Sequence, residues 1–252
     1  MKYLMILVLS VCSFARTPID TLALERSDSG SRYIKVHSLT QRYLDQATQN
    51  YGIPWNSNIN YGYVTDARDG QVYRTVVIGT QTWMAQNLNY AGANNLLGAC
   101  YSGVDDNCNK HGRLYLWAAA MDNHVASSSN PSGVRGICPV GWHIPSLAEW
   151  YVLMTYIDSP LIAARSLKST KGWNSSATHW GSGHDVYGFR ATPGGYSSTA
   201  FYSVNISSGI WSTSKNDTGS VLFMFITNAK DSVTIMADAA LIYNVSIRCV
   251  KD

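Results

Sequence analysis

Hydrophobic and polar positions begin to alternate regularly near residue 64, and the first pattern is that of a β-hairpin. Two β-prone runs, Val64–Asp66 and Gln71–Ile78, flank Asp69-Gly70, where glycine supplies the positive φ that a tight turn requires. A second turn at Gly79-Thr80 leads into Thr82–Met84. The pattern therefore predicts a hairpin, a further turn and another extended segment at the start of the folded domain.

Helical patterns occupy the middle of the chain. Ser146 and Glu149 have the spacing of a capping box, in which a hydroxyl and a carboxylate satisfy free backbone N–H groups. Apolar side chains then recur at intervals of three and four residues, namely Leu147, Trp150, Tyr151, Met154 and Ile157. Leu114–Met121, with three alanines, predicts a second helix, and a shorter helical piece is expected between Pro160 and Lys168.

The C-terminal third has β-prone runs separated by Gly, Asn and Ser turns. The runs are Ile210–Thr213, Val221–Thr227, Ser232–Met236 and Val245–Val250. Composition agrees, because 16 Tyr and 8 Trp residues suit pleated, half-buried surfaces better than a helical bundle. Only 14% of residues are charged, and the Lys and Arg residues that leave a net charge of +3 are scattered. This distribution excludes nucleic-acid binding, which requires a basic patch.

The first 15 residues are typical of a signal peptide. Lys2 is followed by an apolar run, Leu4–Cys12, and then by small residues up to Ala15, after which we expect cleavage. The run is too short to span a membrane as a helix, so no transmembrane helix is expected in the mature chain. A lipid anchor at Cys12 is the alternative, although Val11 fits the lipobox motif poorly.

The remainder divides into a spacer and a domain. Residues 16–62 are polar and weakly patterned, which predicts an N-terminal spacer rather than a second folded unit. Residues 63–252 carry all the regular patterns and form the predicted domain. An exported protein of this kind is secreted or displayed on the cell surface.

Cysteine usage supports an oxidising compartment. Cys12 falls in the export signal, which leaves Cys100, Cys108, Cys138 and Cys249 for two bridges. Cys100 and Cys108 flank a short Gly- and Asp-containing loop that can fold back on itself, so we pair them, and Cys138 pairs with Cys249 by elimination. No CxxC pair or HExxH motif is present, so no metal site is expected.

Several short blocks follow one another in order along residues 64–252. They are Asp69–Tyr73, Val77–Leu88, Gly112–Met121, Cys138–Pro145, Glu149-Trp150, Gly188-Phe189, Pro193–Tyr196 and Arg248–Asp252. Taken in this order, they resemble the Fibrobacter succinogenes major paralogous domain family. The resemblance implies an exported protein, often a lipoprotein or surface protein, with no established catalytic role.

Two of these regions also resemble, more loosely, the C-type-lectin-like fold that formylglycine-generating enzymes share. They are Trp142–Trp150 and Ser246–Val250. This second resemblance implies an α+β fold in which about two main helices pack on irregular antiparallel sheets, stapled by disulfides. It also implies that the chain ends lie near one another and that ligands bind in an extended loop region between the helices and the last strands.

The histidines are the first candidates for chemistry. His143 precedes the capped helix, and a hydrogen-bonded, partly buried histidine that holds the loop is the preferred interpretation over a ligand or catalytic base. His179 and His184 lie beside Asp185 in a loop that we expect to be solvated rather than a metal site. If all four later cysteines are paired, none remains as a nucleophile, and no cofactor motif is present.

Aromatic loops are the strongest positive feature. The candidate binding residues lie in or beside Gly-, Ser- and Asn-rich loops and are Trp173, Trp180, His184, Tyr187, Tyr196 and Tyr202. The rings expected in the core are mostly Trp83, Trp117, Trp142, Trp150 and Trp211. The sequence therefore favours a non-catalytic module that binds a polysaccharide or a cell-envelope protein. The alternative is an enzyme on a lectin-like scaffold with a site near His143 or near His179 and His184.

Overall fold

The computed structural model describes residues 24–26, 32–34, 51–94, 96–157 and 159–252. Contacts divide the chain into two units, Met1–Arg42 and Tyr43–Asp252. In the first unit, the described residues form an antiparallel pair of short strands, β1 (Leu24–Arg26) and β2 (Arg32–Ile34). The predicted signal peptide, residues 1–15, and the alternative lipid anchor at Cys12 lie outside the described residues.

The largest sheet joins the beginning and the end of the predicted domain. Its order is β3-β4-β5-β14-β7, and every neighbouring pair is antiparallel. The strands are β3 (Gly62–Thr65), β4 (Val72–Ile78), β5 (Gln81–Met84), β7 (Trp142–His143) and β14 (Val250–Lys251). The predicted β3–β4 hairpin is confirmed, and Gly70 has the positive φ of 75° that its turn requires.

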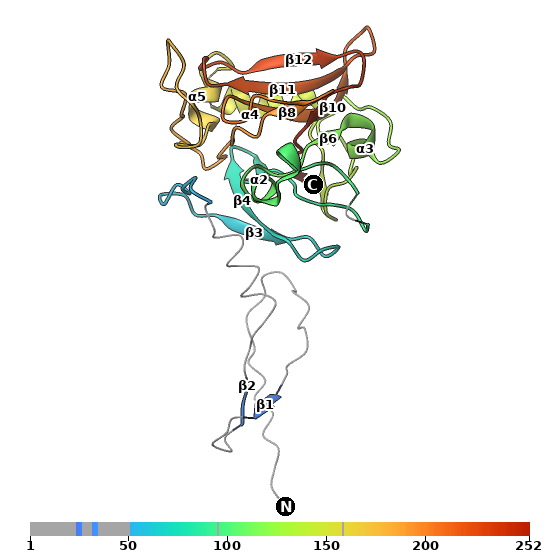
Figure 1. Cartoon of the computed structure of the whole chain (residues 1–252). Coiled ribbons are helices and arrows are strands. Elements are labelled where there is room, and N and C mark those ends of the chain that lie inside the picture. Colours follow the sequence, from blue (N-terminus) through green and yellow to red (C-terminus); the bar gives the residue numbers. More distant parts are fainter. Residues whose placement is uncertain (1–23, 27–31, 35–50, 95, 158) are drawn as a thin grey trace, which may run out of the picture. The chain divides into compact units, whose positions relative to one another are not determined.

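Two further antiparallel sheets complete the second unit. One has the order β10-β11-β12 and the other β6-β13-β8-β9. Their strands are β6 (Tyr115–Leu116), β8 (Tyr196–Ser197), β9 (Phe201–Tyr202), β10 (Ser207–Lys215), β11 (Val221–Thr227), β12 (Thr234–Asp238) and β13 (Asn244–Val245). Figure 1 shows β10–β12 at one end of this unit and the β3–β4 hairpin at the other.

One predicted strand is split. Val245–Val250 does not form a single strand, because Val245 pairs with Tyr115 in one sheet and Val250 pairs with Trp83 and His143 in another. The residues between them cross from sheet to sheet. The prediction that this run is extended was correct at its two ends, but the prediction of one continuous strand was wrong. The partner strands decide where a strand begins and ends, and local sequence does not specify them.

The described residues contain four α-helices and a short 3-10 helix. They are η1 (Tyr101–Gly103), α2 (Asp105–His111), α3 (Trp117–Met121), α4 (Leu147–Tyr156) and α5 (Ala163–Leu167). The capping box of α4 is present, with the Ser146 hydroxyl accepting from Glu149 N and the Glu149 carboxylate accepting from Ser146 N. The fold is thus α+β with mostly antiparallel sheets.

Two predictions about helical and loop segments need correction. The helix expected over Leu114–Met121 begins only at Trp117, because Leu114 bridges to Ala99 and the next two residues enter β6. The segment between Cys100 and Cys108, expected as a loop, instead forms η1 and the start of α2.

The core consists of two groups of buried side chains. One surrounds Tyr115, Trp211 and the Cys138–Cys249 bridge, and the other surrounds Trp83, Trp150 and further apolar residues. Trp83 and Trp150 stack with ring centroids 4.6 Å apart. All five tryptophans expected mostly in the core are buried. Within the described ranges, no helix is long and apolar enough to cross a bilayer.

Candidate functional site

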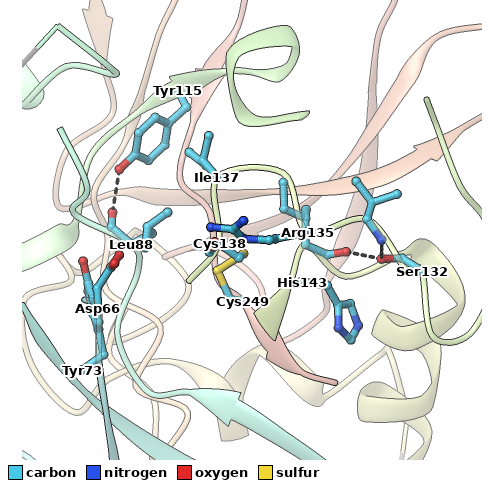
Figure 2. The surroundings of a disulfide bond; sticks show 12 residues. Asp66, Tyr73, Leu88, Tyr115, Ser132, Arg135, Ile137, Cys138, His143 and Cys249 are labelled. Atoms are coloured by element: carbon cyan, nitrogen blue, oxygen red, sulfur yellow. Dashed lines mark hydrogen bonds between the residues drawn. A yellow bond between two sulfur atoms is a disulfide. The ribbon is translucent and has the colours of Figure 1, made fainter. Parts of the chain in front are cut away.

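Both expected disulfides are present, and they lie in different surroundings. Cys138–Cys249 joins residues 111 positions apart and is fully buried. Figure 2 shows this bridge together with His143, Tyr115 and Leu88. The bridge holds the last strand against the middle of the chain, next to the β14–β7 pairing. Cys100–Cys108 joins residues only 8 positions apart, across η1 and the first turns of α2.

His143 is held from two sides. Its Nε2 lies 2.7 Å from Oε1 of Glu149, and its Nδ1 lies 2.7 Å from Oδ1 of Asp252. The other oxygen of Glu149 accepts from Ser132 N and Ser146 N, so three hydrogen bonds hold this buried carboxylate. Burial alone lowers the pKa of His143, but the hydrogen bonds to both carboxylates outweigh it and raise the pKa. The histidine is therefore the hydrogen-bonded loop anchor that the sequence predicts.

The other two candidate histidines have separate partners. His179 Nδ1 lies 2.9 Å from the hydroxyl of its neighbour Thr178, and His184 Nε2 accepts from Arg165 Nε at 3.3 Å. Asp185, which follows His184 in the chain, is buried and accepts from Arg190 N at 2.6 Å. Burial raises the pKa of Asp185 to about 7. Across the described residues, no group of three or more His, Cys, Asp or Glu side chains is arranged to hold a metal ion.

The predicted aromatic surface does not form as one patch. Trp173 is only 6% exposed and its indole N–H donates to Ser169 Oγ, so the candidate role of this ring in binding is corrected to a place in the core. Trp180, by contrast, is 92% exposed. Tyr187 is half-buried and contacts the Tyr156 ring edge-on.

Tyr196 and Tyr202 are the two candidates that the structure brings together. Their rings stack with centroids 5.4 Å apart across the β8–β9 pair. Phe201, the neighbour of Tyr202 on β9, is exposed and lies with its ring centroid 5.2 Å from that of Tyr101. This second pair of rings connects β9 to η1, which directly follows Cys100 of the short disulfide.

A cleft of about 960 Å³ opens beside this short disulfide, and the sequence analysis did not predict it. Its wall comes from the β3–β4 turn, from the segment after β5, from η1 and α2, and from β9. The lining residues are Asp69, Gln71, Asn89, Ala91, Gly92, Ala99, Cys100, Ser102, Gly103, Asp105, Cys108, Asn109, Arg113 and Phe201. The only sequence signal for it was the close spacing of the two cysteines around Gly and Asp residues.

Two residues that line the cleft each carry a buried polar atom without a hydrogen-bond partner among the described residues. The atoms are Oδ1 of Asn89, an acceptor, and Nε of Arg113, a donor. Each atom has less than 1 Å² of accessible surface, so neither is open to the cleft, and leaving such a group unsatisfied costs about 1–3 kcal/mol. Burial also raises the pKa of Asp69, whose carboxylate accepts from Gln71.

The sequence model of a family described as the Fibrobacter succinogenes major domain matches residues 76–251. This chain belongs to that family. No curated protein and no solved structure matches it. The family resemblance seen in the short sequence blocks is thereby confirmed.

The Fibrobacter succinogenes major domain of this chain starts within β4 and ends within β14. It therefore contains both disulfides, His143 and its partner Glu149, and most of the cleft wall. Asp69 and Gln71, in the β3–β4 turn, precede the matched segment and complete the cleft.

Proposed function

We propose that this chain is an exported, non-catalytic binding module that attaches to a polysaccharide or another cell-envelope component. The observation that carries the proposal is the open cleft beside Cys100–Cys108, which is lined by polar side chains and by the exposed ring of Phe201. Ligand sites are usually concave and combine apolar surface with a few placed polar groups.

Export is supported by the two disulfides, because such bridges persist in oxidising compartments and are rare in the cytosol. We further propose a C-type-lectin-like scaffold, secreted or displayed on the cell surface. The pairing of β5, near the start of the domain, with the last strand β14 supports this assignment, because it brings the two ends of the domain into one sheet.

Two observations favour binding over catalysis: the cysteines are oxidised, and His143 is hydrogen-bonded at both ring nitrogens. The four later cysteines are oxidised, which leaves none of them as a thiolate. Both ring nitrogens of His143 are engaged by carboxylates, whereas a general base needs one nitrogen facing a substrate.

An enzyme site near His143 is the second candidate, because a hollow of about 280 Å³ is lined by Glu149 and Asp252. Its neighbours include Gln81, Thr82 and Lys251, and a ligand there would meet both carboxylates that hold the histidine. A site at His179 and His184 has less support, since the two side chains have different partners.

The test is retention on insoluble polysaccharides and on isolated cell envelopes, using the exported full chain with both bridges intact. We expect retention that exceeds that of an unrelated disulfide-bonded protein, with no release of reducing ends or other low-mass products. Failure to bind any polysaccharide or envelope fraction would contradict the proposed function. Product release that disappears in His143→Gln would instead support the enzyme candidate.

A further inference from the structure

A second hollow, of about 510 Å³, adjoins the cleft, and Arg68 and Arg135 are among the residues that line it. We infer that this hollow binds the carboxylate of a uronic acid unit in a glycan, with Arg135 as the main contact and Arg68 beside it. The inference rests on the proposed function and names one charged feature of its ligand. Neither arginine was among the binding residues that the sequence suggested.

Both arginines are attached to one short loop. Arg68 Nη2 donates to Ile137 O at 2.8 Å, and Arg135 Nε donates to Cys138 O at 3.1 Å. These two carbonyl groups belong to consecutive residues, so the guanidinium groups are held at neighbouring points of the backbone. Figure 2 shows the guanidinium group of Arg135 beside Cys138.

The loop is itself fixed before any ligand arrives. Cys138 N donates to Arg135 O at 3.0 Å, which closes a turn. Ile137 N donates to Ala120 O of α3 at 2.9 Å, and the disulfide ties Cys138 to Cys249. A preorganised site loses less conformational entropy on binding than one that must be ordered by its ligand.

The two arginines keep N–H donors for a ligand. Within the part of the chain that the structure describes, no group accepts a hydrogen bond from Nη1 of Arg68 or from either Nη atom of Arg135. Arg135 is exposed, and the side chain of Arg68 remains 24% exposed. Two N–H groups along one edge of a guanidinium match the two oxygens of a carboxylate.

The charges around the hollow fit one carboxylate better than a phosphate. Asp66 pairs with Arg68 at 2.6 Å and offsets its charge. Asp122 is exposed and lines the hollow, so its carboxylate offsets the charge of Arg135. The hollow therefore offers several donors but little net positive charge. A carboxylate brings one negative charge to these donors, whereas a phosphate brings almost two.

Apolar side chains in the same hollow provide a surface for a sugar ring. Tyr90 is half-buried, and its ring centroid lies 3.8 Å from Cζ of Arg68. Leu97 also lines the hollow. A sugar ring presents C–H groups on its faces, and the carboxylate of a uronic acid projects from the edge of the ring. The ring can therefore contact these apolar groups while the carboxylate pairs with Arg135.

The adjoining cleft favours uncharged units next to the uronic acid. Ala91 and Gly92 line both the hollow and the cleft, so one oligosaccharide can extend from one to the other. The charged residues that line the cleft are Asp69, Asp105 and Arg113. Two carboxylates against one guanidinium repel a second anionic unit more than they attract it. The preferred ligand is therefore a uronic acid flanked by neutral sugars.

Calorimetric titration of the intact, disulfide-bonded protein tests the ligand class. One pair of probes is xylotriose with and without a single glucuronic acid branch. The other is the galacturonic acid trimer with its carboxylates free or methyl-esterified. We expect the branched xylotriose to bind at least about 10-fold tighter than xylotriose, because charge-assisted hydrogen bonds are strong.

Equal affinities within both pairs would overturn the inference. A difference in the galacturonic acid pair alone would support the uronic acid but refute the preference for neutral neighbours. Displacement of the branched xylotriose by inorganic phosphate, but not by acetate at the same ionic strength, would overturn the carboxylate assignment.

Variants test the contacts. Arg135→Gln removes the guanidinium and should weaken binding of the branched xylotriose at least about 10-fold, while binding of xylotriose stays unchanged. Arg135→Lys keeps the charge but not the paired donors, so it should recover only part of the affinity. Asp122→Asn removes a repelling charge and should tighten binding several-fold.

Matched controls separate the site from a general effect of charge. Arg165→Gln and Asp217→Asn make the same changes of charge at exposed positions outside both hollows, and both should bind like the parent. Equal losses in Arg165→Gln and Arg135→Gln would overturn the site assignment. Near-ultraviolet circular dichroism and free-thiol titration show whether each variant is folded with both bridges formed, and Arg135→Lys provides the test if Arg135→Gln does not fold.

The outcomes also separate this inference from the proposed function. If the protein is retained on polysaccharide or cell envelopes but the acidic probes show no preference and Arg135→Gln behaves like the parent, the uronic acid site is wrong while the proposed function stands. If no polysaccharide, envelope fraction or oligosaccharide binds, both are wrong.

Discussion

The two disulfides define regions of opposite character. The Cys138–Cys249 bridge is itself sealed from solvent, and both ring nitrogens of nearby His143 have carboxylate partners. Around Cys100–Cys108 a cleft is open to solvent, and the exposed ring of Phe201 is among its lining residues. The same covalent bond thus stabilises the fold in one region and shapes a surface in the other.

Removal of the long bridge should have the largest effect. Cys138→Ala with Cys249→Ala frees a loop of 111 residues, and the loss of loop-closure entropy alone predicts about 4–5 kcal/mol less stability. Because both sulfurs are buried in the core, cavity formation adds to this loss. Urea unfolding followed by tryptophan fluorescence measures the difference, and a loss smaller than that of the short bridge would break the comparison.

Removal of the buried carboxylate should rank second. Glu149→Ala takes away a partner of His143 and the acceptor for Ser132 N and Ser146 N, so we expect a loss of about 3 kcal/mol or more. Asp217→Ala is the control, since that acidic residue is exposed, and it should change stability by less than about 0.5 kcal/mol. If both changes shifted the urea midpoint equally, the hydrogen bonds of Glu149 to His143 and to the two serine N–H groups would contribute nothing to stability.

Removal of the short bridge should lower stability less than removal of the long bridge does, but it should weaken ligand binding. Cys100→Ala with Cys108→Ala frees a loop of only 8 residues, for which loop-closure entropy predicts about 2.5 kcal/mol. Because the bridge lies in the cleft wall, we expect weaker retention on polysaccharide at temperatures where the variant is still folded. Unchanged retention would mean that the short bridge does not shape the site.

The smallest expected effect is a pH dependence of stability that comes from His143, close to the buried bridge. The pKa of His143 is raised above its ordinary value of about 6.5, so its stabilising charge is fully present below that pH and lost as pH rises through the folded pKa. Burial of Asp185, with its pKa raised to about 7, also lowers stability as pH rises toward that value.

Comparison of the parent with a variant of His143 isolates the histidine, because Asp185 titrates in both proteins. We expect the melting temperature of the parent to fall between about pH 7 and 9 more steeply than that of His143→Gln, whose side chain does not titrate. Parallel curves for the two proteins would exclude His143 as the titrating group.

Local signals in the sequence predicted a substantial part of the fold. The turn glycine of the β3–β4 hairpin, the capping box of α4 and the bridge between Cys100 and Cys108 each depend on residues close together in the chain. Helix α2 was missed because its sequence, rich in Asp and Asn, has weak helix propensity. The anchor role of His143 was also predictable, but not its partner Asp252, which lies 109 positions away.

The sequence by itself determined the family, the Cys100–Cys108 pair and the capped helix, because motif order, spacing and turn chemistry can be read along the chain. The Cys138–Cys249 pair then followed by elimination, and the α+β class followed from a resemblance. Only the tertiary structure decided that Trp173 is buried while Trp180 is exposed, and that the run after Val245 divides between two sheets. It alone assembled the cleft, whose residues come from Asp69 to Phe201. Burial and strand pairing depend on contacts between distant segments, and local sequence patterns do not encode which segments will meet.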